Sequence, residues 1–138
     1  MQRVQSHTTR HADGTVDVVQ SVEASPIRSA ADLQRLYWQE VRRVTFGLVR
    51  FRGDAIRILG IGPTLIRFGP LRDGGRSIVG GVFSRGGHGR IRWSADGGTI
   101  LVAVERFAPL LRGPLWNAES RFHGYVGRRF LARAARSD

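Results

Sequence analysis

The sequence contains two titratable side chains whose positions suit general acid–base chemistry, a histidine and a glutamate in apolar surroundings. His123 follows Phe122 in a segment with helical spacing of apolar residues, and an imidazole transfers protons near neutral pH. Its alternative role is that of a partly exposed boundary residue. Glu105 lies in the strand-like run of residues 100–107, where alternation places it on the face opposite Val104. Both are candidate catalytic residues, although an ion pair with a neighbouring arginine is the favoured interpretation for Glu105.

A second group of residues suits the lining of a pocket for an apolar ligand. Aromatic side chains bury large areas and keep a polar group, although a solid core uses the same residues. The candidate lining residues are Tyr37, Trp93, Trp116, Phe122 and Val126. Arg67 lies between Ile66 and Phe68 in a short apolar run, so it is a candidate partner for Glu105 or for a ligand carboxylate. The default for such an arginine is to point outwards.

Several other kinds of chemistry are not indicated by the sequence. It has no cysteine, which excludes a disulfide framework, a thiolate nucleophile and a thiolate metal ligand. It contains no His-Glu-x-x-His motif and no acidic cluster, so no metal site and no cofactor are predicted. Glycine-rich residues 80–81 and 86–89 fall between strand-like runs and lack the Lys-Ser or Lys-Thr ending of a phosphate-binding loop. Nucleotide hydrolysis is therefore not expected.

The chain is strongly basic, with 22 basic residues, 11 acidic residues and a formal net charge of +11. All of the basic residues are arginine, which the codon usage of a GC-rich genome explains most simply. The charge nevertheless predicts attraction to acidic partners. Residues 50–52 and 90–93 interleave arginine with aromatic side chains, a pattern typical of proteins that bind single-stranded nucleic acid. A solvated strand face gives the same pattern, so clustering of the arginines in space separates these interpretations.

The spacing of apolar residues predicts a strand, a helix, six further strands and a final helix. Residues 16–22 alternate as in a strand, and Ser29 has the form of a cap for a helix over residues 30–44. The further strands are expected at residues 45–52, 55–60, 64–69, 77–84, 89–94 and 99–107. The expected hairpin turns are residues 53–54 and 96–98. Pro114 suits the start of the final helix. The apolar stripe of that helix is Leu115, Ala118, Phe122, Val126 and Phe130.

Together these elements predict one α+β domain over residues 14–138, a curved antiparallel sheet of about seven strands wrapped around a long C-terminal helix. Residues 1–13 are polar and are expected to form a disordered tail. No apolar run approaches the roughly 20 residues of a membrane-spanning helix, and the N-terminus lacks a secretory pattern. A cytoplasmic protein is therefore expected, and an exposed sheet edge makes a homodimer a possible assembly.

This order of elements resembles the helix-grip fold of the START, Bet v 1 and polyketide cyclase (SRPBCC) superfamily. The resemblance covers residues 15–135 and rests on the order and length of the elements. It implies that the last helix roofs a cavity on the concave face of the sheet, where an apolar or amphipathic ligand binds. It also implies that any catalysis would be a cyclase or dehydratase type of proton transfer using His123 or Glu105.

Three functional hypotheses follow, and whether the protein catalyses a reaction stays open among them. Binding of a small apolar or amphipathic molecule in the cavity is the leading hypothesis. The second is a basic module that binds nucleic acid or another acidic partner. The third is a structural or interaction protein whose core is filled.

Overall fold

The structure, a computed structural model, describes residues 4–24, 28–59, 62, 64–80, 89–107 and 114–135. Side chains are described throughout these ranges except at residues 96 and 114–120. The strands are β1 (Gln5–Arg10), β2 (Val16–Glu23), β3 (Val49–Arg52), β4 (Ala55–Ile58), β5 (Thr64–Phe68), β6 (Gly75–Gly80), β7 (Arg90–Asp96) and β8 (Thr99–Phe107). The helices are α1 (Ala30–Val44) and α2 (Pro114–Ala134).

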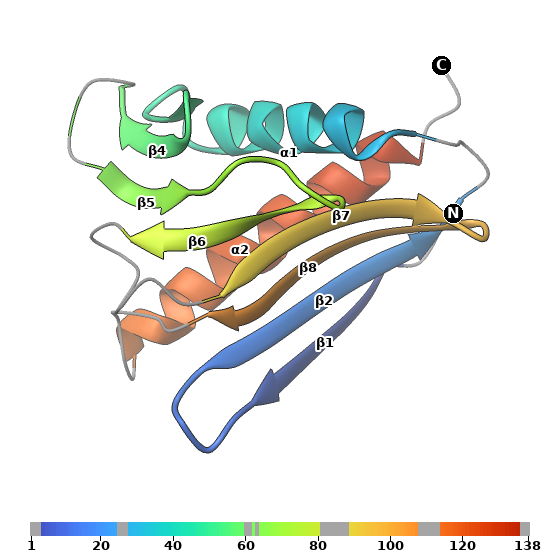
Figure 1. The fold of residues 1–138 in the computed structure, drawn as a ribbon, viewed down its shortest axis with the longest axis horizontal. Helices are drawn as coiled ribbons and strands as arrows, with labels where there is room; N and C mark the ends of the chain where they lie inside the picture. Colours follow the sequence, from blue (N-terminus) through green and yellow to red (C-terminus); the bar gives the residue numbers. More distant parts are fainter. Residues whose placement is uncertain are drawn as a thin grey trace.

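The eight strands of the described chain form one antiparallel sheet in the order β1-β2-β8-β7-β6-β5-β4-β3. Strands β3 to β8 follow one another as a meander, and β2 pairs with β8. The sheet curves around α2, which packs against β2, β8 and α1 (Figure 1). The predicted α+β fold, a curved antiparallel sheet with a long C-terminal helix against it, is confirmed and is consistent with a helix-grip arrangement.

Residues 5–10, expected to belong to a disordered tail, instead form β1 and add an eighth strand to the sheet. All of the side chains of β1 are exposed, so backbone hydrogen bonds to β2 hold this strand in place. A strand without a buried face leaves no apolar alternation in the sequence, which explains why it was not predicted. The turn into β2 is fixed by Asp13, whose Oδ1 accepts hydrogen bonds from the N–H and the hydroxyl of Thr15.

Helix α1 begins and ends where the sequence predicts. The Ser29 side chain accepts a hydrogen bond from the Asp32 N–H at 3.1 Å, which satisfies one free donor of the first turn. At the other end the Gly47 N–H donates to the Arg42 carbonyl at 2.7 Å, which closes the helix. The buried residues of α1 are Leu33, Tyr37, Trp38, Glu40 and Val41.

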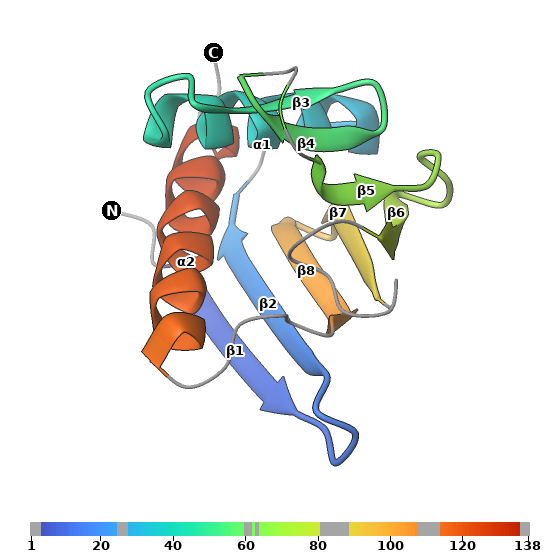
Figure 2. The ribbon, with the colours of Figure 1, turned by 90° about the vertical axis from the view of Figure 1, so that its left-hand side faces the viewer.

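Helix α2 lies along the concave side of the sheet and approaches β2 closely (Figure 2). The Gly124 carbonyl accepts a hydrogen bond from Gln20 Nε2 at 3.1 Å, and any side chain at position 127 would collide with Gln20. Glycine at position 127 therefore lets α2 pack closely on β2 without displacing the Gln20 side chain. The described apolar side chains that α2 buries are Val126, Phe130, Leu131 and Ala134, whereas Phe122 of the predicted stripe is 40% exposed.

One β-bulge in β8 decides which side chains face the concave side of the sheet. Arg106 adopts a left-handed backbone conformation with φ of 54°, and its N–H donates a hydrogen bond to Asp17 Oδ1 at 2.7 Å. The bulge turns Arg106 outwards and brings Phe107 to the same side as Val104. Simple alternation predicts Arg106 beside Val104, and this prediction is wrong because the sequence does not mark a bulge at a non-glycine residue.

The core lies between the concave side of the sheet and the two helices. An aromatic cluster joins α1, α2 and the sheet, with neighbouring ring centroids between 4.6 and 6.1 Å apart. Its members are Tyr37, Trp38, Phe51, Phe68, Trp93 and Phe130. Trp38 and Phe51 stack with an interplanar angle of 2°, which fixes the edge strand β3 against α1.

Candidate functional site

A cavity of about 140 Å³ lies in the core, between the concave side of the sheet and the two helices. Every strand from β3 to β8 contributes to its wall, and the strands contribute only apolar side chains. The helices contribute Tyr37, Trp38 and Val41 from α1 and Phe122, His123 and Val126 from α2. The cavity therefore lies where the last helix packs against the concave face of the sheet.

The wall of the cavity is uncharged at neutral pH. The titratable side chains among its described lining residues are Tyr37 and His123. Burial raises the pKa of the Tyr37 phenol, so its hydroxyl stays protonated. Burial lowers the pKa of the His123 imidazole from its usual value, so its ring is mostly neutral at neutral pH. A charged ligand would lose its hydration here without gaining a countercharge, so the cavity favours uncharged molecules.

The volume of the cavity limits what it can hold. Apolar cavities of about 150 Å³ stay dry and accept benzene or xenon, whereas pockets for drug-sized ligands measure roughly 300–1,000 Å³. At about 140 Å³, this cavity holds one small ring or a short aliphatic chain. A multi-ring polyketide does not fit within it.

The lining residues of the cavity differ in their exposure. Phe122 of α2 is 40% exposed, and His123, Val49 and Ile56 are partly exposed. Val126 is fully buried.

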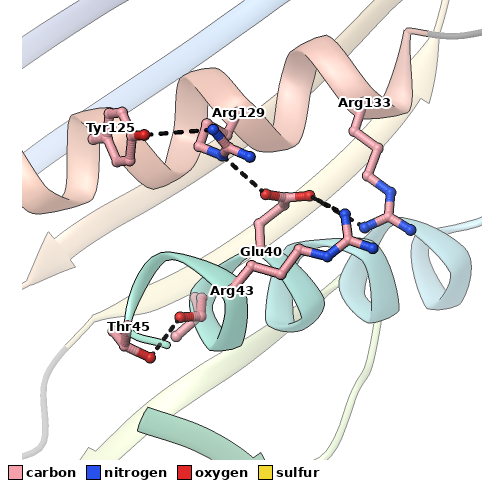
Figure 3. A network of polar contacts seen from close by, with 7 residues as sticks. Glu40, Arg43, Thr45, Tyr125, Arg129 and Arg133 are labelled. Atoms are coloured by element: carbon pink, nitrogen blue, oxygen red, sulfur yellow. Dashed lines mark hydrogen bonds and ion pairs between the residues drawn. The ribbon is translucent and has the colours of Figure 1, made fainter. Parts of the chain in front are cut away.

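A buried carboxylate of α1 holds α2 against α1 (Figure 3). Glu40 of α1 is only 2% exposed, and its two oxygens are contacted by three arginines. Arg133 and Arg43 donate to Oε1 at 3.2 and 3.4 Å, and Arg129 donates to Oε2 at 3.3 Å. Arg129 also donates to the Tyr125 hydroxyl at 3.4 Å. Because Arg129 and Arg133 come from α2, this network positions a helix that lines the cavity.

The structure brings some of the sequence-predicted site residues together and places others elsewhere. Those that meet at the cavity are Tyr37, Phe122, His123 and Val126. Trp93 is fully buried beside Tyr37, with ring centroids 5.7 Å apart, and belongs to the aromatic core rather than to the cavity wall. The side chain of Trp116, like those of Leu115 and Ala118, lies outside the described residues.

Arg67 and Glu105 lie on the outer, convex face of the sheet. Arg67 is exposed on β5, between the buried side chains of Ile66 and Phe68. Glu105 Oε1 accepts a hydrogen bond from Arg92 Nε at 2.8 Å, so the ion pair favoured for this glutamate is present. Strands β6 and β7 separate Arg67 from Glu105, and neither residue lines the cavity.

Leu65 and Ile66 both line the cavity, although sequence alternation assigns them to opposite faces of β5. Ile56 pairs with Ile66 and Arg57 pairs with Thr64, so Leu65 is the extra residue of a β-bulge. The bulge turns both side chains inwards, and both are buried. The only signal in the sequence is that both residues are apolar.

The described residues contain no group of three or more His, Asp or Glu side chains that could hold a metal ion. Within the same ranges, no helix is long and apolar enough to span a membrane. Comparison of the chain with models of known protein families, with curated proteins and with solved structures finds no match.

Proposed function

We propose that the protein binds one small, uncharged, apolar molecule in the cavity between the sheet and the helices. The observation that supports this function is the cavity itself, about 140 Å³ of space with an apolar wall. Its size favours a single aromatic ring or a short aliphatic chain as the ligand.

The energetic cost of the cavity supports a ligand as its occupant. Cavities left by substitutions in apolar cores lower stability by about 24 cal/mol per Å³, so a space of about 140 Å³ corresponds to a cost of up to roughly 3 kcal/mol. This is a large part of the roughly 5–15 kcal/mol by which most domains are stable. A ligand that fills the space restores the missing contacts and stabilises the folded state.

The arrangement of elements supports the same proposal through resemblance to the helix-grip superfamily, whose members hold apolar ligands beneath the last helix. Membership of that superfamily is part of the proposal. The small volume narrows the range of possible ligands, because a substrate of several rings exceeds the space. The protein therefore suits a compact ligand better than an extended one.

Binding is better supported than catalysis. His123 is the candidate acid or base at the cavity, and its lowered pKa keeps the ring neutral and able to accept a proton. Glu105 lies on the outer face in an ion pair with Arg92, so it does not act on the same ligand. A cyclase or dehydratase reaction would therefore depend on His123 alone.

Native mass spectrometry of the purified protein, followed by denaturing extraction, tests this function. We expect a bound molecule of low mass and low polarity in the wild-type protein. The variant Val126→Phe, which fills the cavity, should carry none, whereas Val79→Phe on the exposed surface should carry it as the wild type does. Equal amounts in both variants would place the ligand elsewhere, and a protein that neither copurifies with nor takes up small apolar compounds would contradict the proposal.

A further inference from the structure

A second hollow lies between α1 and the edge strand β3, and Trp38 lines both this hollow and the cavity. It measures about 490 Å³ and adjoins another hollow of about 440 Å³. The two share Gln39, Arg42 and Arg50 as lining residues, so they form one continuous depression, the basic groove. Its charged lining residues are Arg35, Arg42, Arg43, Arg50 and Arg52.

Most of the positive charge of the basic groove is not neutralised within the described chain. Arg35 pairs with Asp32 on the surface at 3.5 Å, and Arg43 contacts the buried carboxylate described above. The arginines of the groove that have no carboxylate partner among the described residues are Arg42, Arg50 and Arg52. No acidic residue of the described chain lines the groove. The groove therefore attracts an anionic partner.

The pairing of β3 with β4 adds to this charge. Arg50 lies directly opposite Arg57, an arrangement in which the two like charges share one face of the sheet. Arg50 is held by a hydrogen bond from its Nε to the Gly47 carbonyl at 2.8 Å. A neighbouring anion would relieve the repulsion between the two guanidinium groups.

The other segment that interleaves arginine with aromatic residues, at positions 90–93, is used within the fold. Arg90 donates to the carbonyls of Arg72 and Asp73 at 2.7 and 3.1 Å. Arg92 pairs with Glu105 at 2.8 Å. The two segments look alike in the sequence, but Arg92 has a carboxylate partner, whereas neither Arg50 nor Arg52 has one in the described chain.

An exposed aromatic ring stands beside the basic groove in a strained backbone conformation. Phe46 follows α1 in the left-handed region, with φ of 55°, at the position where helices usually end with glycine. A non-glycine residue there costs about 1–2 kcal/mol. The Phe46 side chain is 99% exposed, so burial of the ring does not offset this backbone strain. The strain therefore points to a role for the ring outside the folded chain.

We propose that the basic groove binds single-stranded nucleic acid, with phosphates against Arg42, Arg50 and Arg52 and a base stacked on Phe46. Basic grooves with an aromatic platform bind single strands with little sequence preference, because every base presents a π face. Gln34 and Gln39 line the same groove and add hydrogen-bonding groups for base edges or sugars. The basic groove is separate from the cavity, so this proposal does not depend on whether the cavity binds an apolar ligand.

A single strand fits this surface better than the other anionic partners do. A duplex keeps its bases stacked inside and offers none to Phe46. A membrane surface is flat and does not enter a concave groove, although it could contact the exposed side chains of Phe46, Leu48 and Leu59. The binding experiment below distinguishes a duplex and a membrane surface from a single strand.

Fluorescence anisotropy with a labelled oligothymidine of about 15 nucleotides tests the proposal on the full chain. Three phosphate contacts give a slope of roughly −2 in a plot of log affinity against log salt, so affinity should fall about 20-fold between about 50 and about 200 mM salt. The double variant Arg50→Gln and Arg52→Gln should lose most of this binding. The matched double variant Arg10→Gln and Arg121→Gln, with the same loss of charge at exposed positions outside the groove, should keep it.

Phe46→Gly separates the function of the ring from any effect on folding. Glycine relieves the left-handed backbone, so the melting temperature should rise by roughly 4 °C or more. Loss of one base stack should nevertheless weaken oligothymidine binding by at least about fivefold. No binding at low salt, equal losses in the two arginine double variants, or unchanged affinity of Phe46→Gly would overturn the proposal. So would tighter binding to the matching duplex, or binding only to vesicles of anionic lipid.

Discussion

The cavity and the basic groove share the side chain of Trp38 as a wall, yet they differ in the properties that select a ligand. The cavity is small, apolar and uncharged, whereas the groove is about 490 Å³ and lined by arginines. Strand β3 contributes lining residues to both the cavity and the groove. Val49 lines the cavity, whereas Arg50, Phe51 and Arg52 line the groove, where Phe51 stacks on Trp38. One short strand thus contributes both to an apolar site and to a basic one.

The largest effect is expected from removal of the shared wall. Trp38→Ala deletes a buried side chain that contacts Tyr37, Phe51, Phe68 and Trp93, and should lower the free energy of unfolding by about 3–5 kcal/mol. Urea unfolding measures this loss. Trp38→Phe keeps an aromatic wall and should lose less than half as much. A loss below about 1 kcal/mol for Trp38→Ala would show that the wall is not part of the core.

The next effect contrasts a buried carboxylate that three arginines contact with an exposed carboxylate that one arginine contacts. Glu40→Gln removes the charge that three arginines contact, and should destabilise the fold by about 1–3 kcal/mol. Because those arginines are partly exposed, the loss of free energy of unfolding should be smaller than for a fully buried ion pair. Asp32→Asn, which breaks the exposed pair with Arg35, should change stability by less than about 1 kcal/mol. Equal effects in urea unfolding of the two variants would contradict the contrast.

Acidification should affect the cavity through His123. Its pKa is lowered by burial, so the unfolded chain takes up the proton first. The stability contributed by the neutral ring is complete above a pH of about 6.5 and is lost as pH falls through that value towards the lower pKa of the folded state. Urea unfolding across this range should show a smaller decline for His123→Asn than for the wild type. The lowered pKa values of Asp13 and Asp17 act at lower pH, below about 4.

The smallest effect concerns the like-charged pair that borders the groove. Arg57→Glu places a carboxylate opposite Arg50 and should stabilise the hairpin of β3 and β4 by roughly 0.2–1 kcal/mol. The same change should weaken oligothymidine binding, because it neutralises part of the groove. Arg67→Glu serves as the control, since Arg67 lies directly opposite Ala55 rather than opposite another arginine. Destabilisation by Arg57→Glu would mean that the two guanidinium groups do not repel each other in the fold.

Local signals in the sequence predict most of the elements correctly. The cap at Ser29 marks the start of α1, and alternation marks β2 and most of β8. The turn between β7 and β8 consists of Gly97 and Gly98, both with positive φ, as the glycines indicate. Such features depend on residues that are neighbours in the chain, which is why the sequence reveals them.

The candidate sites depend on features that a single sequence does not mark. The bulges at Leu65 and Arg106 change which side chains face inwards, and alternation carries no sign of them. Tyr37, His123 and Val126 were predicted because the helical spacing and the expected roof helix place them inwards. Arg92 has a carboxylate partner and Arg50 and Arg52 have none in the described chain, which depends on the side chains that other strands bring near, so only the fold reveals this difference.

The most direct test of the cavity as a binding site is a titration of the protein with benzene, followed by nuclear magnetic resonance. We expect saturable binding of one benzene per chain, with the largest shifts at residues such as Ile78, Val104 and Val126. Val126→Phe should abolish this binding, and the surface variant Val79→Phe should leave it unchanged. Absence of saturable binding by the folded wild type, or equal binding by the two variants, would contradict the assignment of the cavity as a ligand site.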